Sequence, residues 1–422
     1  ESDPELTSQS ALMGLLRRIA RVVGPGPVVL LMTGGLISIA TAVSMARTDG
    51  GSVTAQTLYV LGLVVIFLPA AIGVLLPKAR ASTRILLALS MAVLLQLTRL
   101  VLYPTRFMFH DELIHANVLR LIGETGHLFT ENSLLPITSY YPGLEIATNA
   151  VHDLTGLSAY ASGVVILIAS RIVIALAVFA VYLVVSRRQG SRTSLVMPVL
   201  ATVAVTFSHH VTAGLLIAAY LVWWALELLL HRKRRNASRS LGAMVVVAGA
   251  SFAVSLANPG NTLFTYLGSI GQSSVDAVVA VLGGKQTRKV FQNSAGVVTA
   301  PWEKYAIIAS LALTLAVLIP AVIRSRRFLE RRVASVLLLL LVAILYPLIP
   351  GGHLTVSTAE VGDRSAGFVF LGVAFVVGWW VWQHRMTGWK TSLLAVGATV
   401  IFIGSVVLGA GSITQQLPGP FR

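Results

Sequence analysis

The sequence contains no cysteine, and only 11% of its 422 residues are charged. The first absence excludes disulfides, thiolate metal sites and cysteine nucleophiles. The second argues against a soluble globular protein, because such proteins carry roughly a quarter charged residues. Apolar residues make up 55% of the chain, and its mean hydropathy is +0.81. A lipid bilayer accepts this much apolar surface, so the composition predicts a polytopic membrane protein.

Acidic residues are also scarce, since 16 Asp and Glu accompany 32 Lys and Arg. The basic residues form short clusters between apolar runs, as cytoplasmic loops of membrane proteins do. They do not form the single basic patch that nucleic-acid binding would require, so no nucleic-acid partner is expected. The clusters lie at 17–21, 78–84, 187–192, 231–235, 324–332 and 384–390.

Apolar runs that can cross about 30 Å of hydrocarbon recur along the chain. If every basic cluster is cytoplasmic, an even number of spans must separate consecutive clusters. The stretch 194–230 therefore holds two short spans that are joined by a tight external turn at 207–212. The eleven predicted spans are 27–46, 57–76, 85–103, 164–186, 194–208, 211–230, 241–257, 304–323, 333–349, 366–383 and 392–410.

We therefore predict an all-α polytopic protein with about eleven transmembrane helices in one membrane domain, residues 27–410. Segment 1–26 is expected in the cytoplasm. The tail 411–422 is expected outside the plasma membrane, where it could lead into a further external domain. Any chemistry should face outward, because the internal loops are short and basic. The predicted external loops are 104–163, 258–303 and 350–365.

The first external loop holds six of the sixteen acidic residues and opens with the sequence FMFHDELIH, residues 107–115. Asp111 and His115 would share one face if a helix starts here. The free amides of a first helical turn favour a charged carboxylate. Ionised Asp111 could then act as a general base or, with Glu112, bind a divalent cation such as Mg, Mn or Ca. Alternatively, Asp111 only caps the helix.

The apolar residues that follow predict how this segment lies on the membrane. The spacing of Leu113, Val118, Leu121 and Ile122 indicates an amphipathic helix on the membrane surface. Such a helix would hold the acidic cluster, with His110 beside it, at the outer edge of the bilayer.

Two further polar motifs lie on the same predicted side. Tyr140 and Tyr141, before a Pro-Gly turn, could shape a pocket for a sugar ring or a lipid head group. They could equally belong to an interfacial aromatic belt. His209 and His210 lie in the predicted 207–212 turn, where both could bind a phosphate or one, His210, could ligate a metal. The alternative is a polar turn without a ligand.

Several basic residues run against the positive-inside bias. External cations could bind the phosphate of a membrane lipid, or they could contact head groups and nearby acids. Arg99 and Arg171 fall in the outer thirds of their spans, where a charge is costly. The external basic residues are Lys285, Arg288, Lys289, Lys304 and Arg364, the last beside Asp363.

Taken together, the topology and three motifs resemble the GT-C superfamily of integral-membrane glycosyltransferases. Its members include protein mannosyltransferases, aminoarabinose transferases and mycobacterial arabinofuranosyltransferases. The resemblance covers the topology of most of the chain, while its specific part is small. The motifs are His110-Asp111-Glu112, Tyr140-Tyr141-Pro142-Gly143 and Gly362-Asp363-Arg364-Ser365.

The resemblance implies an inverting sugar transfer from a polyprenyl-phosphate donor to an extracytoplasmic glycan, lipid or protein. Asp111 matches the loop carboxylate that serves as catalytic base or metal ligand, with Glu112, His110 or His115 orienting it. By role, Arg364 and the 285–289 cluster match the cations that bind the donor phosphate. The chain has no Asp-x-Asp motif, which some members carry.

Three other functions are compatible with the sequence. A lipid-linked glycan flippase or another transporter should place polar residues at mid-membrane positions, whereas here they gather at the outer side. A polysaccharide polymerase or ligase would share the donor and differ in product size. A scaffold without activity would tolerate substitutions in the acidic cluster.

Overall fold

The computed structural model describes residues 25–187, 196–230, 235–257, 261–283, 291–292, 298–331, 333–353, 355–384 and 388–419. These parts of the chain are helical and contain no strand, so the predicted all-α polytopic architecture is confirmed. Nine helices within them are long and apolar enough to cross a membrane. They are α2 (Pro25–Asp49), α3 (Val53–Leu75), α4 (Ala81–Leu102), α7 (Ala159–Arg187), α9 (His210–Leu230), α10 (Arg235–Leu256), α12 (Pro301–Arg331), α15 (Val356–Gln383) and α16 (Trp389–Ala410).

Two further apolar helices, α8 (Val196–Ser208) and α13 (Ala334–Ile344), are shorter than a full span. Each of the eleven predicted runs overlaps one of these eleven helices. The total of eleven spans stays a prediction. The remaining helices are α5 (His110–Thr125), η1 (Pro136–Tyr140), α6 (Gly143–Thr155), α11 (Leu263–Leu282), α14 (Leu348–Gly352) and α17 (Ile413–Gln416).

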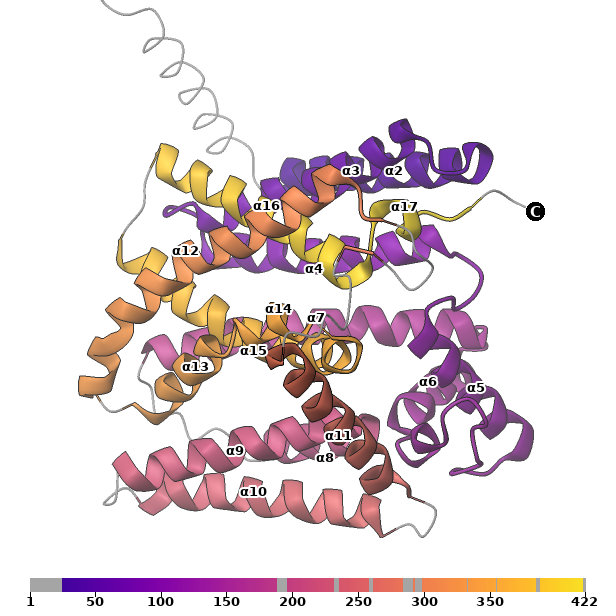
Figure 1. Cartoon of the computed structure of the whole chain (residues 1–422), viewed down its shortest axis with the longest axis vertical. Helices are drawn as coiled ribbons and strands as arrows, with labels where there is room; N and C mark the ends of the chain where they lie inside the picture. Colours follow the sequence, from indigo (N-terminus) through magenta and orange to yellow (C-terminus); the bar gives the residue numbers. More distant parts are fainter. Residues whose placement is uncertain are drawn as a thin grey trace, which may run out of the picture.

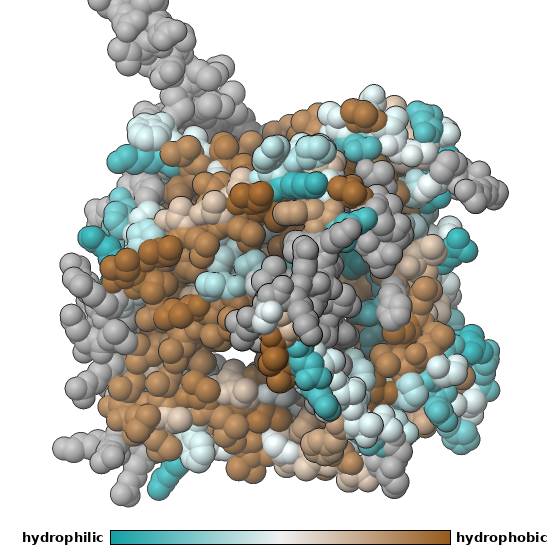
Figure 2. Space-filling model, viewed as in Figure 1, coloured by the Kyte–Doolittle hydropathy of each residue, from teal (hydrophilic) through white to brown (hydrophobic). Residues whose placement is uncertain are grey.

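The long helices stack in three groups (Figure 1). The first group is α2, α3, α4, α12 and α16, with α7 packed on α4, the second is α13 and α15, and the third is α8, α9 and α10. Helices α5 and α6 lie together at the right of Figure 1, where α6 contacts α7 and α8. In Figure 2, brown apolar residues cover much of the helical sides, while teal polar residues gather around α5 and α6. This distribution suits a molecule whose sides face lipid and whose ends face water.

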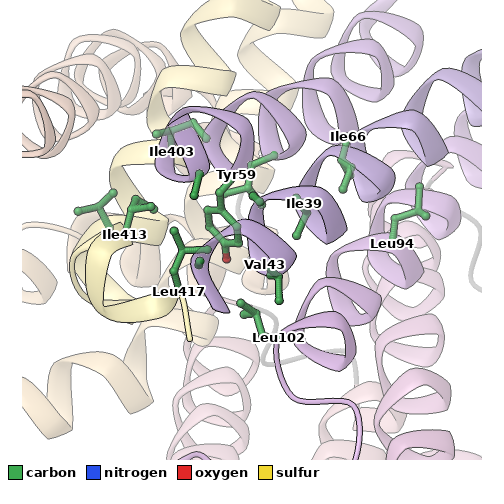
Figure 3. Close-up of a cluster of buried hydrophobic side chains, with 14 of the residues drawn as sticks. Ile39, Val43, Tyr59, Ile66, Leu94, Leu102, Ile403, Ile413 and Leu417 are labelled. Atoms are coloured by element: carbon green, nitrogen blue, oxygen red, sulfur yellow. The ribbon is translucent and has the colours of Figure 1, made fainter. Parts of the chain in front are cut away.

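The largest apolar core joins α2, α3 and α4 to α16 and the segment after it. Ile39 lies between Tyr59 and Leu94, and Ile403 and Leu417 belong to the same cluster on the side of Tyr59 (Figure 3). Close packing of this kind matters in a bilayer, where hydrophobic burial between helices gives little net driving force. At the α2–α3 contact, a Cβ on Gly35 would lie 2.6 Å from the Gly62 carbonyl oxygen. Small residues therefore set the distance between these helices.

The helix ends that the charge pattern assigns to one side of the membrane lie together. Arg47 donates to the Leu102 carbonyl oxygen over 2.8 Å, and the Tyr160 hydroxyl donates to the Tyr103 carbonyl oxygen over 2.5 Å. The buried Glu303 carboxylate, in the first turn of α12, accepts from the Ser412 hydroxyl and the Ile413 amide over 2.8 and 2.7 Å. These bonds fix the starts of α7 and α12 against the ends of α4 and α16.

We predict that Gly404→Ala lowers the thermal unfolding midpoint of the purified protein, whereas Gly409→Ala on the same helix leaves it unchanged. A Cβ on Gly404 would overlap the Ala306 carbonyl oxygen and the Ser310 Cβ, while one on Gly409 meets nothing within 4 Å. Overpacking of this kind costs about 1–3 kcal/mol. Equal midpoints for the two variants in detergent would contradict the close α12–α16 contact.

Candidate functional site

Helix α5 carries the acidic cluster of the first long loop, and Glu112 fixes where this helix begins. The Glu112 carboxylate accepts from the backbone amides of Phe109 and Met108 over 3.3 and 3.4 Å. Its other oxygen lies 3.7 Å from an Arg99 guanidinium nitrogen. The helix ends at Gly126, whose φ of +67° is the left-handed conformation that favours glycine. Glu112 therefore anchors α5 to the end of α4.

The returning part of the loop packs on α5 through a buried asparagine. The Asn132 amide nitrogen donates to the Ile114 carbonyl oxygen over 3.2 Å and to the Thr138 hydroxyl over 3.0 Å. Its carbonyl oxygen accepts from the Asn117 amide over 2.7 Å. These bonds hold η1 against α5 and satisfy a polar side chain that is fully buried.

A pocket of about 420 Å³ of empty volume, partly open to solvent, lies where four segments meet. Three of its walls come from α5, from η1 with its flanking residues, and from the α8–α9 turn, and the fourth comes from α11. It brings together Asp111, His115, Tyr141 and His209, which the sequence had singled out separately. The lining residues are Asp111, Ile114, His115, Leu135, Thr138, Tyr141, Ser208, His209 and Tyr266.

The His115 ring is hydrogen-bonded to a buried carboxylate that does not line the pocket. Its Nδ1 lies 2.6 Å from an Oε1 of Glu145, a side chain on α6 that is only 1% exposed. The second carboxylate oxygen of Glu145 is buried and has no hydrogen-bond partner within the described segments. When the carboxylate accepts from Nδ1–H, the neutral ring carries its proton on Nδ1, and Nε2 is left as a hydrogen-bond acceptor.

In His209, by contrast with His115, Nδ1 is the hydrogen-bond acceptor. Its Nδ1 accepts from the Thr212 backbone amide over 3.2 Å and lies 3.0 Å from the Thr212 hydroxyl. This bond caps the start of α9 and leaves the proton of a neutral ring on Nε2. The pocket therefore combines one imidazole with acceptor character at Nε2 and one with donor character there.

The α8–α9 turn reaches the pocket because α6 begins with a glycine. Helix α8 ends at Ser208 and α9 starts at His210, so the turn is as tight as expected from the sequence. A Cβ on Gly143 would lie 2.6 Å from the Ser208 hydroxyl and 2.9 Å from the Phe207 carbonyl oxygen. Only glycine permits this approach, which the Tyr-Tyr-Pro-Gly motif did not reveal.

Other predicted residues lie away from the pocket. Tyr140 stacks with Phe129 at a centroid distance of 6.4 Å, and Lys304 lies 5.8 Å from the centre of the Phe291 ring. Asp363 and Arg364 lie inside α15, which starts at Val356, and the part of α15 that is apolar enough to cross a membrane begins directly after them, at Ser365.

Some predictions lie outside the described parts of the chain. Lys285, Arg288 and Lys289 belong to a segment that the structure does not describe. The side chains of His110, His210, Asp363 and Arg364 are likewise outside the description, although their backbones lie in helices.

The predicted metal ligands were Asp111, Glu112 and His210. Within the described residues, no group of three His, Asp or Glu side chains could hold a metal ion. The Glu112 carboxylate already accepts from two backbone amides and faces Arg99, so it does not fit a ligand role in this arrangement.

We predict that Gly143→Ala opens the pocket, whereas Gly123→Ala, in the same loop, has no effect. The added Cβ would push the Phe207 carbonyl and the α8–α9 turn away from α6, while a Cβ on Gly123 meets nothing within 4 Å. Because the chain has no cysteine, a single Leu135→Cys on the pocket wall can report the change. Its reaction with a small maleimide should become several-fold faster in the Gly143→Ala background only. Equal rates would contradict the described contact.

No family model, curated protein or solved structure matches this chain.

Proposed function

We propose that this protein is a GT-C-type membrane glycosyltransferase, which moves a sugar from a polyprenyl-phosphate donor to a hydroxyl of an extracytoplasmic glycan, lipid or protein. One observation carries the proposal. The exposed carboxylate of Asp111 and the carboxylate-backed imidazole of His115 share a pocket at the ends of membrane helices. A base in such a place can reach both a water-soluble acceptor and a lipid-borne donor.

In this proposal, Asp111 accepts the proton of the acceptor hydroxyl as its oxygen attacks the anomeric carbon of the sugar. The new C–O bond forms while the bond from the anomeric carbon to the phosphate oxygen breaks. The lipid phosphate leaves with the electron pair, and direct displacement inverts the anomeric centre.

The two histidines have complementary roles. His115 lies four residues after Asp111 and orients the acceptor through Nε2, with Glu145 keeping its ring and tautomer in place. His209 donates from Nε2 to the oxygen of the leaving phosphate, where negative charge develops. Tyr141 supplies an aromatic wall against which a sugar ring can pack.

The pocket is expected to face the outside of the plasma membrane. The positive-inside rule places the six basic clusters, and with them the amino terminus, in the cytoplasm. The first long loop and the carboxyl terminus then lie outside. A divalent cation, and donor contacts by Arg364, Lys304 and the 285–289 cluster, remain part of the prediction from the sequence.

We predict that Asp111→Asn lowers sugar transfer by at least about 100-fold, because the variant keeps the shape of the side chain and loses the base. The measurement is transfer from a labelled polyprenyl-phosphate sugar in membranes that contain equal amounts of each variant. Glu124→Gln, on the exposed side of the same helix, is the matched control and should retain activity. Near-normal turnover by Asp111→Asn would remove Asp111 from the chemistry.

For Glu145→Gln we expect a fall of about 10–100-fold in kcat, with the donor KM unchanged. Glu145 does not line the pocket and acts through His115, so donor contacts should persist. Glu145→Asp, which retains the charge on a shorter side chain, should recover part of the loss. A change confined to KM, or no recovery with aspartate, would make Glu145 a purely structural residue.

A further inference from the structure

Arg99 of α4 and Arg171 of α7 lie near the contact between these two helices, and neither lines the pocket. The bond from Tyr160 to Tyr103 aligns the start of α7 with the end of α4, and the two helices run in opposite directions. At a rise of 1.5 Å per residue, Arg171 lies about 16 Å along α7 from Tyr160, and Gln96 lies about 10 Å along α4 from Tyr103, both measured from the aligned helix ends. The Arg171 side chain therefore reaches back toward the outer end of α4.

The side chains that contact Arg99 and Arg171 carry less negative charge than the two guanidinium groups carry positive charge. Arg171 is exposed on the helical surface and donates from Nε to the neutral Gln96 amide oxygen over 3.4 Å. No carboxylate of the described residues pairs with it. Arg99 is 41% exposed, lies over the Phe109 ring at 3.9 Å, and meets Glu112 only at 3.7 Å. Gln96 lies three residues before Arg99 on α4, about one helical turn away, so the two guanidinium groups occupy neighbouring positions along this contact.

An arginine at this depth in a bilayer is costly unless an anion compensates it. Glu112 supplies one negative charge for two guanidinium groups, and that charge is also shared with the start of α5. Because Arg171 is exposed and only 11% of the apolar window of its helix is buried, an anion can reach it from the uncovered surface of α7. A phosphate fits, since its oxygens match the planar fork of a guanidinium group.

We propose that Arg99 and Arg171 bind the phosphate of an anionic membrane lipid at the contact between α4 and α7. Arg99 sits at the head-group end and Arg171 reaches up from below, so together they hold a phosphate beside the first turn of α5. Tyr103, Phe109 and Tyr160 surround this place and suit the interface between head groups and lipid tails. The occupant is either a bulk phospholipid or the lipid phosphate of the donor, and the second case rests on the proposed function.

The test is lipid binding to the full chain in phosphatidylcholine nanodiscs with or without phosphatidylglycerol. In the wild type, phosphatidylglycerol should raise the thermal unfolding midpoint and remain bound in native mass spectrometry. Arg171→Gln should lose the shift and bind about tenfold less of this lipid. Arg120→Gln is the control, because Arg120 is exposed on α5 and already paired with Glu124. An unchanged response of Arg171→Gln would overturn the proposal.

Gln96→Glu keeps the test decisive if Arg171→Gln fails to fold. This variant places a carboxylate beside the Arg171 guanidinium and so supplies the missing charge from within the protein. It should fold in phosphatidylcholine alone and no longer respond to phosphatidylglycerol. A response equal to that of the wild type would also overturn the proposal.

A competition experiment identifies the source of the phosphate. If polyprenyl phosphate displaces phosphatidylglycerol equally well from the wild type and from the control Arg120→Gln, the donor lipid is an occupant of the site. Persistent phosphatidylglycerol identifies a bulk lipid. Both results support the site, and neither depends on sugar transfer, so a failure of the proposed function would be seen separately.

Discussion

The contact between the His115 imidazole and the buried Glu145 carboxylate joins the two helices of the first long loop. Helix α6, which carries Glu145, also packs on α7 and on α8. Through Gly143 it holds the α8–α9 turn, and with it His209, against the pocket. Helix α5 is fixed separately to α4 by Glu112 and Arg99. The pocket therefore exists because the buried Glu145 carboxylate connects α5 to α6, and α6 in turn holds the α8–α9 turn.

The parts of this arrangement that depend on local patterns could be predicted from the sequence. Apolar runs bounded by basic clusters located the membrane helices, since length and charge decide where a segment crosses a bilayer. The start of α5 followed from the acidic residues of its first turn. The turn at 207–212 followed from the need for an even number of spans between basic clusters.

The parts that depend on contacts between distant segments could not be predicted. Glu145 lies thirty residues after His115, and only the packing of α6 on α5 shows that it is the partner of that ring. Helix α11 was expected as a loop, yet it supplies Tyr266 to the pocket wall. No local pattern singles out Asn132, which is fully buried between α5 and η1. Such roles follow from tertiary packing, which a single sequence does not encode in any local pattern.

The most direct test of the proposed site is photocrosslinking with a polyprenyl-phosphate sugar that carries a diazirine on the sugar. The protein would be labelled in nanodiscs, digested, and mapped by mass spectrometry. We predict that label appears on peptides from α5, from η1 and its flanks, and from the α8–α9 turn, and that unlabelled donor suppresses it. Label confined to the opposite helix ends, or label that excess donor does not suppress, would contradict a donor site in this pocket.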